Sequence, residues 1–271
     1  MMKIFRHTLP FLVGVVLVSL GLRISALAAS SSGSVAGVEK YGEAAIRDFT
    51  LRLNDELDAR GVNVAIVARA GRSRAKMPAG INYTHVGIIV FEAVRSADGS
   101  IAHTYTVYNL YQGDEGRDDR SYLAQDFTYD FLAGVLEPDV AVCVPSEVLQ
   151  RRLLAVVRSP AYRALHNPVY NLVANPSVDR FDNCVTHTLK ICVAAIYQTD
   201  DRTRIYDDIR AYFRPTPVRL GPLQSFGSAF MRSISREDMD PSGLRTATYD
   251  SLKAFLESNG LVKEAFTLRI N

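Results

Sequence analysis

The chain has 271 residues, of which 48% are hydrophobic and 22% are charged, and its formal net charge is +2. This composition is typical of a folded domain and excludes disordered, collagen-like and multi-span membrane chains. The near balance of cations and anions also argues against a nucleic-acid partner, because nucleic-acid binders carry a concentrated excess of positive charge.

The N-terminal segment, residues 1–28, predicts a secretory signal peptide. A positively charged start leads into an apolar run over 9–22 and then into Ala26-Leu27-Ala28, which is a typical cleavage signature. The apolar run is shorter than the roughly 20 residues that span a bilayer, so cleavage is favoured over a retained anchor. Its removal lowers the formal net charge from +2 to −1. We therefore expect an exported protein, periplasmic or secreted, with no integral membrane span after cleavage.

The rest of the chain divides into a linker over 29–37 and one domain over 38–271. Hydrophobic periodicity and turn residues predict the domain's elements. In chain order they are a helix over 38–60, strands over 62–68, 83–91 and 102–111, a helix over 123–132, a strand over 140–144, a helix over 145–157, an irregular loop over 166–177, helices over 184–197 and 202–213, a short helix after 221, and a helix over 251–257. The turn at Asp98-Gly99 joins the second and third strands into an antiparallel hairpin. The expected fold class is α+β.

The sharpest local feature is Asp182-Asn183-Cys184, at the predicted start of an apolar helix. Asp182 and Asn183 lie where an N-cap belongs. A helix N-terminus favours thiolate over thiol, so we expect a reactive Cys184. The alternative is a buried cysteine that merely packs. Three cysteines cannot all pair, and Cys184 and Cys192 would be too far apart along one helix, so any disulfide must involve Cys143.

A nucleophilic cysteine needs a base, and histidine suits this role because its pKa lies near neutrality. His85 stands in a strongly apolar strand, and Gly87 keeps the same face of that strand open. Its alternative is a core histidine bonded to the backbone. We expect His103 to be solvated, His166 to orient its loop, and His187 to be a satisfied or exposed surface residue.

Other chemistries lack their usual signals. The sequence contains no HExxH, CxxC, phosphate-binding loop, GxGxxG or GxSxG motif. The spacings of His85, His103, His166 and Cys184 do not match a compact zinc site. We therefore predict no metal and no cofactor. The acidic stretch 114–119 is expected to be a solvated loop.

Several motifs together resemble a known family. They are RAG at 69–71, YTHVGI at 83–88, YNLVANP at 170–176, NC at 183–184 and TATYDSL at 246–252. This set resembles the bacterial domain-of-unknown-function family 2145, over nearly the whole of the predicted domain. A histidine strand that precedes a cysteine helix also resembles the circularly permuted NlpC-type branch of the papain-like cysteine peptidases and amidases. Unlike family members that carry a histidine in the third strand, this chain has Asn109.

The resemblance implies a papain-like antiparallel sheet packed against helices. It also implies an exported cysteine hydrolase or acyltransferase, with Cys184 as nucleophile, His85 as general base, and Asn109 or Gln112 as the residue that orients the imidazole. The thiol is expected within about 4 Å of an imidazole nitrogen. A peptide, a lipid or a small amide or ester of the cell envelope would be the substrate.

Substrate contacts are expected from Arg69, Tyr83 and Asn183. Arg69 should leave the first strand at the same end of the sheet as His85. The alternative function is an inactive binding or structural module of the same fold, and a redox role for Cys143 with another cysteine is a minor option.

Overall fold

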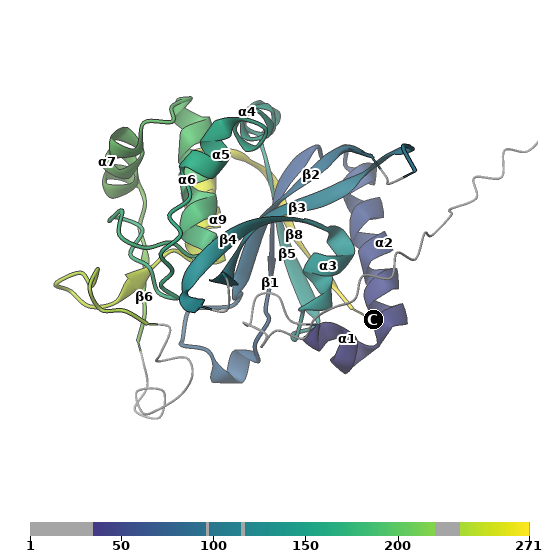
Figure 1. The fold of residues 1–271 in the computed structure, drawn as a ribbon, viewed down its shortest axis with the longest axis horizontal. Coiled ribbons are helices and arrows are strands. Elements are labelled where there is room, and N and C mark those ends of the chain that lie inside the picture. The colour runs from purple at the N-terminus through teal and green to yellow at the C-terminus, as the bar shows by residue number, and fades with distance from the viewer. Residues whose placement is uncertain (1–34, 96–97, 115–116, 220–233, 271) are drawn as a thin grey trace, which may run out of the picture.

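The computed structural model describes residues 35–95, 98–114, 117–219 and 234–270. A six-stranded sheet forms its centre, with every neighbouring pair antiparallel, and helices cover both faces (Figure 1). The α+β class predicted from the sequence is confirmed at this level. The predicted signal peptide and most of the predicted linker lie outside the described residues.

The strands follow the order β4-β3-β2-β1-β5-β8 across the sheet. Their bounds are β1 Val64–Arg69, β2 His85–Arg95, β3 Ile101–Asp114, β4 Arg117–Phe127, β5 Asp139–Pro145 and β8 Val262–Arg269. Every residue of β1 is buried, as is typical of a strand with helices on both sides. A separate small ribbon pairs β6 Thr216–Pro217 with β7 Arg245–Thr246.

Two layers of helices flank the sheet (Figure 1). We call the first the α6 layer; it contains α4 Glu147–Val157, α5 Pro160–Ala164, α6 Cys184–Tyr197, α7 Arg202–Tyr212 and α9 Tyr249–Ser258. The second, the α3 layer, contains α1 Ala36–Tyr41, α2 Glu43–Ala59 and α3 Thr128–Ala133. A short 3-10 turn, η1 Arg74–Lys76, follows β1.

Alternate side chains of β2 belong to different layers, as the pleat of a strand requires. Val86, Ile88 and Val90 pack in the core of the α6 layer. Ile89 packs in the core of the α3 layer with Phe49 and Phe131. Two hydrophobic cores therefore meet at one sheet, and the strand that carries His85 contributes to both.

Several sequence predictions need correction. The single helix over 38–60 is interrupted at Gly42, whose φ of 84° lies in the left-handed region. Residues 123–132 are not one helix, because β4 runs to Phe127 before α3 begins. The described residues of the acidic stretch 114–119 are strand, since Asp114 ends β3 and β4 starts at Arg117. Strand β8 was not predicted at all. The short helix expected after 221 begins outside the described residues.

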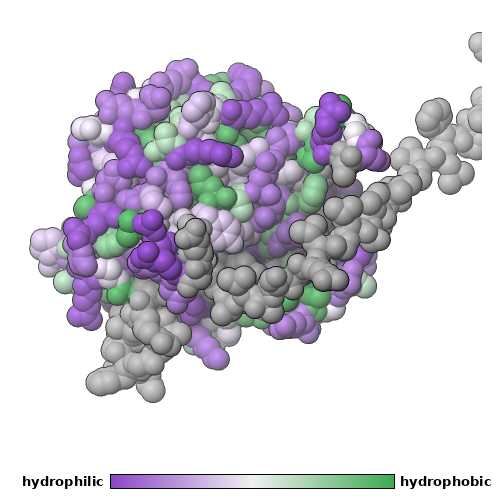
Figure 2. All heavy atoms as spheres, viewed as in Figure 1, coloured by the Kyte–Doolittle hydropathy of each residue, from purple (hydrophilic) through white to green (hydrophobic). Residues whose placement is uncertain are grey.

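The face of the molecule seen in Figure 2 is mainly hydrophilic, and its hydrophobic residues form only small separate patches. Within the described ranges, no helix combines the length and the apolar character needed to cross a bilayer.

Candidate functional site

Cys184 is the first residue of α6, as the sequence predicts. Asn183 is the N-cap, and its side-chain oxygen accepts from the backbone amides of Val185 and Thr186 at 3.0 and 2.9 Å. The Thr186 hydroxyl in turn accepts from the Asn183 amide at 2.7 Å and completes a capping box. This reciprocal pairing fixes where the helix begins and so fixes the direction in which the Cys184 side chain leaves it.

The thiol of Cys184 lies against the backbone at the start of β2. It donates to the Thr84 carbonyl, with the sulfur 3.8 Å from the oxygen, and it lines a small cavity of about 70 Å³. Burial raises the pKa of Cys184 to about 11, although the Val86 amide, the Arg69 charge and the amides at the start of α6 all favour the thiolate. The expectation that the helix N-terminus alone gives a lowered pKa is therefore wrong. Desolvation outweighs it in this buried position.

His85 opens β2 and is 1% exposed. Its Nε2 lies 3.2 Å from Oδ1 of Asn109, and its Nδ1 has no hydrogen-bond partner among the described residues. The ring stacks on Tyr111 with centroids 4.9 Å apart and contacts Phe131 of α3. Burial and the nearby charge of Arg69 lower the pKa of His85, so the imidazole is neutral.

Gly87 makes the contact between His85 and Asn109 possible. A Cβ at this position would lie 2.6 Å from Oδ1 of Asn109 and 2.6 Å from Cγ1 of Val107. The glycine that the sequence analysis interpreted as an open face therefore makes room for the residue that holds the imidazole. Of the two candidates for that role, the structure joins Asn109 to His85. Gln112 instead donates to the Asp118 carbonyl at 2.8 Å.

Cys184 and His85 reach the same end of β2 from different layers. The thiol contacts the Thr84 carbonyl, one residue before His85, and packs in the α6 layer. The imidazole lies in the α3 layer with Tyr111 and Phe131. In the described part of the chain, no hydrogen bond joins Cys184 to the His85 ring. The Cys184 thiol and the His85 ring therefore lie near the same end of β2 on opposite faces of the sheet, and the expected thiol–imidazole contact is not formed.

The residues around His85 form what we call the His85 cluster: Arg69, His85, Asn109, Tyr111 and Asp126. Arg69 pairs with His85 across β1 and β2, at the predicted end of the sheet. Its guanidinium is fully buried and donates to the Gly134 carbonyl at 2.6 Å, so it faces the protein interior rather than an open cleft. Burial lowers the pKa of Arg69, and the neighbouring Tyr111, Cys184 and Asp126 partly offset this effect.

Sequence analysis missed Asp126 and Tyr111. The Asp126 carboxylate accepts from the Tyr111 hydroxyl at 2.5 Å and from the Asn109 amide nitrogen at 3.0 Å. Asp126 fell inside a segment predicted to be helical, and only the register of β3 against β4 brings it beside Asn109. Residues 117–127 show no regular alternation of polar and apolar side chains, so the local sequence carried no clear strand signal for finding it.

Tyr83 and Asn183, the other two residues predicted to contact substrate, both line the cavity beside Cys184. The Tyr83 hydroxyl donates to Asp139 at 3.1 Å, which leaves its ring as cavity wall. Asn183 uses its amide nitrogen to hold the Leu172 carbonyl at 3.1 Å, besides capping α6. Tyr170 and Leu172, in the loop before α6, also line this cavity.

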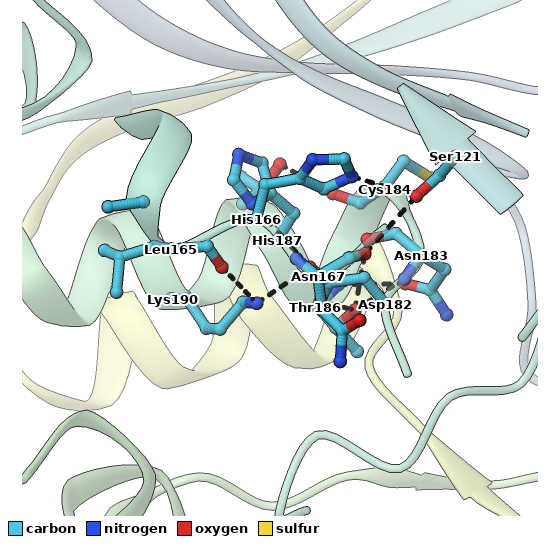
Figure 3. A network of polar contacts seen from close by, with 12 residues as sticks. Ser121, Leu165, His166, Asn167, Asp182, Asn183, Cys184, Thr186, His187 and Lys190 are labelled. Carbon is cyan, nitrogen blue, oxygen red and sulfur yellow. Dashed lines mark hydrogen bonds and ion pairs between the residues drawn. The ribbon is translucent and has the colours of Figure 1, made fainter. Parts of the chain in front are cut away.

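A buried ion pair supports the loop that leads to Cys184 (Figure 3). Lys190 of α6 donates to Asp182 at 2.7 Å and to the Leu165 carbonyl at 2.5 Å, and both charged side chains are almost fully buried. Asp182 also accepts from the Thr186 hydroxyl at 3.0 Å and from the Asn167 amide at 2.9 Å. The pair therefore ties the middle of α6 to both ends of the preceding loop.

The other histidines differ in how well the sequence predicts them. His103 is exposed, as expected, and His166 bonds the Ser121 hydroxyl at 2.9 Å (Figure 3). His187 is 2% exposed, and neither ring nitrogen has a hydrogen-bond partner among the described residues. The prediction of a satisfied or surface His187 is therefore wrong, because α5 and the loop before α6 cover this side of the helix; the ring contacts Tyr162 and His166.

Cys143, Cys184 and Cys192 are all free and buried. Burial raises the pKa of Cys143 to about 12, so it is a thiol at neutral pH. Within the described residues, no group of three or more histidine, cysteine or acidic side chains is arranged to hold a metal ion.

Comparison with known proteins identifies the family. Residues 56–256 match the family described as "Uncharacterized protein conserved in bacteria (DUF2145)", and this match covers most of the chain. The chain therefore belongs to that family, as its motifs indicated. No curated protein matches it, and no solved structure does.

Proposed function

We propose that this member of the DUF2145 family is a cysteine hydrolase or acyltransferase that acts on an amide or ester bond. Cys184 is the nucleophile, His85 the base and later the acid, and Asn109 the residue that orients the imidazole. The observation that carries the proposal is the state of His85: Nε2 is bonded to Asn109, while the buried Nδ1 has no partner, at the strand end where the Cys184 thiol lies. A cysteine, a histidine and an asparagine that bonds the histidine are the components of papain-like catalysis.

The raised pKa of Cys184 determines the order of events. At neutral pH the resting side chain is a thiol, so a preformed thiolate–imidazolium pair is not the resting state. His85 must take the proton as the sulfur attacks, which requires Nδ1 and Sγ to come within hydrogen-bond reach when substrate is bound. Because the two side chains lie in different layers, this approach requires the start of β2 to move when substrate binds, and not only the tightening of an existing hydrogen bond.

The reaction then proceeds in two steps, acylation and deacylation, and His85 transfers the proton in each. The Cys184 sulfur forms a bond to the carbonyl carbon while its proton passes to Nδ1 of His85, and the tetrahedral oxyanion faces the amides of Cys184 and Val86. The imidazolium returns the proton to the leaving amine or alcohol as the acyl–cysteine thioester forms. Water, or an acceptor alcohol or amine, then gives its proton to His85 and displaces the thiolate, which is reprotonated.

The cavity beside Cys184 limits what part of a substrate enters. About 70 Å³ between Tyr83, Tyr170 and Leu172 fits a small group next to the scissile carbonyl rather than a large side chain. An exported chain would meet peptides, lipids and small amides or esters of the cell envelope, and we include these substrates and the export itself in the proposal.

A second candidate is a binding module of the same fold that has no catalytic activity. It is favoured by the burial of the thiol, which is 7% exposed, and by a larger groove that Cys184 does not line. That groove has a volume of about 690 Å³ and lies between β4 and α5, with Arg158, Tyr162 and His166 in its walls. Its size suits a small-molecule ligand.

The pH dependence of thiol alkylation separates the two candidates. An unassisted thiol with a pKa near 11 reacts about tenfold faster for each unit of pH, because only the thiolate attacks. If His85 takes the proton, the rate of Cys184 alkylation is nearly constant over about pH 7–9, and His85→Gln restores the tenfold dependence. His103→Gln, at an exposed histidine, is the matched control.

Cys184→Ser identifies the reacting thiol, because it removes the alkylation while Cys143 and Cys192 remain. Wild-type alkylation that rises tenfold per pH unit, with or without His85, would reject the hydrolase proposal and leave the binding module.

A further inference from the structure

Asp126 lies directly opposite Val107 in the β3–β4 pairing, on the side of the sheet that carries the His85 cluster. One oxygen of its carboxylate accepts two hydrogen bonds, from the Asn109 amide nitrogen at 3.0 Å and from the Tyr111 hydroxyl at 2.5 Å. The carboxylate is therefore an acceptor placed against the group that contacts His85.

The side-chain amide of Asn109 has a defined orientation. Its nitrogen faces two groups that can only accept, the Val107 carbonyl at 2.8 Å and the Asp126 carboxylate at 3.0 Å. Reversal of the amide would place its oxygen against both acceptors and lose both hydrogen bonds. The Asn109 oxygen must therefore face His85, which it does at 3.2 Å.

This orientation in turn determines where the proton of the neutral imidazole resides. Because Oδ1 of Asn109 is an acceptor, Nε2 of His85 must be the donor and carries the hydrogen. Nδ1 then carries the lone pair, and it is the nitrogen without a partner. A reversed amide would call for the opposite tautomer, whose Nδ1 is protonated and cannot act as a base.

We propose that Asp126 is a positioning residue that selects the base-competent tautomer of His85 by orienting the Asn109 amide. This inference rests on the proposed function for its catalytic meaning, whereas the selection of the tautomer is a property of the folded chain alone. Asp126 acts through Asn109 and not on the substrate.

The other charged or titratable groups that face the His85 cluster do not orient the amide. Arg69 of β1 donates to the Gly134 carbonyl, and Tyr111 of β3 donates to Asp126. Asp130 of α3 is close enough to raise the pKa of Asp126 beyond the effect of burial. Asp130 therefore offers a matched control: its neutralisation changes the local charge and leaves both acceptors of the Asn109 amide in place.

The test is the tautomer of His85, measured from the ¹⁵N chemical shifts of its ring, with His85→Gln to assign the signals. In the wild type we expect the Nε2–H form. Asp126→Leu should reduce the preference for that form about tenfold or more, which corresponds to about 1.4 kcal/mol. Asp126→Asn keeps an oxygen that can accept from Asn109 and should retain the Nε2–H form, as should Asp130→Asn.

The outcomes keep the two proposals apart. An unchanged tautomer in Asp126→Leu would overturn the role of Asp126, whatever the chemistry of Cys184. A shift of equal size in Asp130→Asn would show a charge effect and would also overturn it. If Asp126→Leu does not fold, Asp126→Ala provides the same loss of the acceptor with less steric change.

Alkylation of Cys184 in the same variants gives the link to catalysis. Where His85 assists the thiol, the tautomer shift in Asp126→Leu should slow alkylation at pH 7 in proportion to the fraction of the Nε2–H form that is lost, and Asp126→Asn should restore the rate. If the tautomer shifts but His85 does not assist alkylation in the wild type, the proposed function fails and the role of Asp126 stands.

Discussion

The two layers that flank β2 bury charge in different ways. In the α6 layer, Lys190 and Asp182 meet directly at 2.7 Å, and the pair anchors the loop that leads to Cys184. In the α3 layer, Arg69 and Asp126 share the Tyr111 hydroxyl group as a neighbour, and Asp126 also holds Asn109. The first arrangement secures the position of the chain. The second uses the half-buried Asp126 carboxylate to define the hydrogen bonds of one imidazole.

The largest expected effect tests the direct ion pair. Asp182→Ala should lower the free energy of unfolding by about 3–5 kcal/mol, because Lys190 is left as an unpaired buried charge. Chemical denaturation measures it. Asp182→Leu combined with Lys190→Met removes both charges and should recover much of that loss. A cost below about 1 kcal/mol for Asp182→Ala, the value typical of an exposed pair, would show that the pair is not a structural clamp.

A smaller effect tests the packing that brings Asn109 to His85. Gly87→Ala places a methyl group 2.6 Å from both Oδ1 of Asn109 and Cγ1 of Val107 and should cost about 1–3 kcal/mol. It should also separate Asn109 from His85 and so change the ring ¹⁵N shifts. Val107→Ala added to Gly87→Ala relieves only the second contact. If the double variant restores normal His85 shifts, the methyl group does not displace Asn109.

The last test compares the layers through their histidines. Burial lowers the pKa of both His85 and His187, so below about pH 6.5 the unfolded chain takes up protons that the folded chain does not. The free energy of unfolding should therefore decrease as the pH is lowered below about 6.5, by up to about 1.4 kcal/mol per pH unit for each histidine.

Substitution of one histidine isolates its share of this slope. His187→Leu should flatten the pH dependence by up to about 1.4 kcal/mol per pH unit, and His103→Leu, at an exposed histidine, is the matched control. The carboxyl groups of Asp126 and Asp182, whose pKa values are raised by burial, act in the opposite direction in wild type and variant alike. Denaturation curves between pH 5 and 8 measure the slopes, and equal slopes for wild type and His187→Leu would contradict the burial of His187 as a neutral ring.

The parts of the site that local sequence predicts are the start of α6 and the strand of His85. Asn183 before an apolar helical pattern gives the N-cap, and the run around His85 gives a buried strand. Both signals lie within a few residues of the feature that they predict. They place Cys184 and His85 on their elements, but they do not fix the layer that each side chain enters.

The parts that local sequence does not predict depend on contacts far along the chain. Leu123, Phe127 and Phe131 recur at helical spacing, so the β4 segment was interpreted as a helix, and Asp126 was lost from the site. Residues of α6 are buried on every side, from Cys184 to Ala195, because α5 and the loop over 165–182 cover its polar face. A prediction based on an amphipathic helix therefore places His187 at the surface, whereas in the folded chain this side of α6 is buried.

Strand β8 closes one edge of the sheet by pairing along β5, whose seven residues are all buried. The pairing joins segments that lie far apart in the chain, so β5 has no neighbour on that side until β8 docks. A chain shortened before Val262 would present the unpaired backbone N–H and C=O groups of β5 to any other extended strand. Self-association, rather than simple loss of folding, is the hazard that the C-terminal strand prevents.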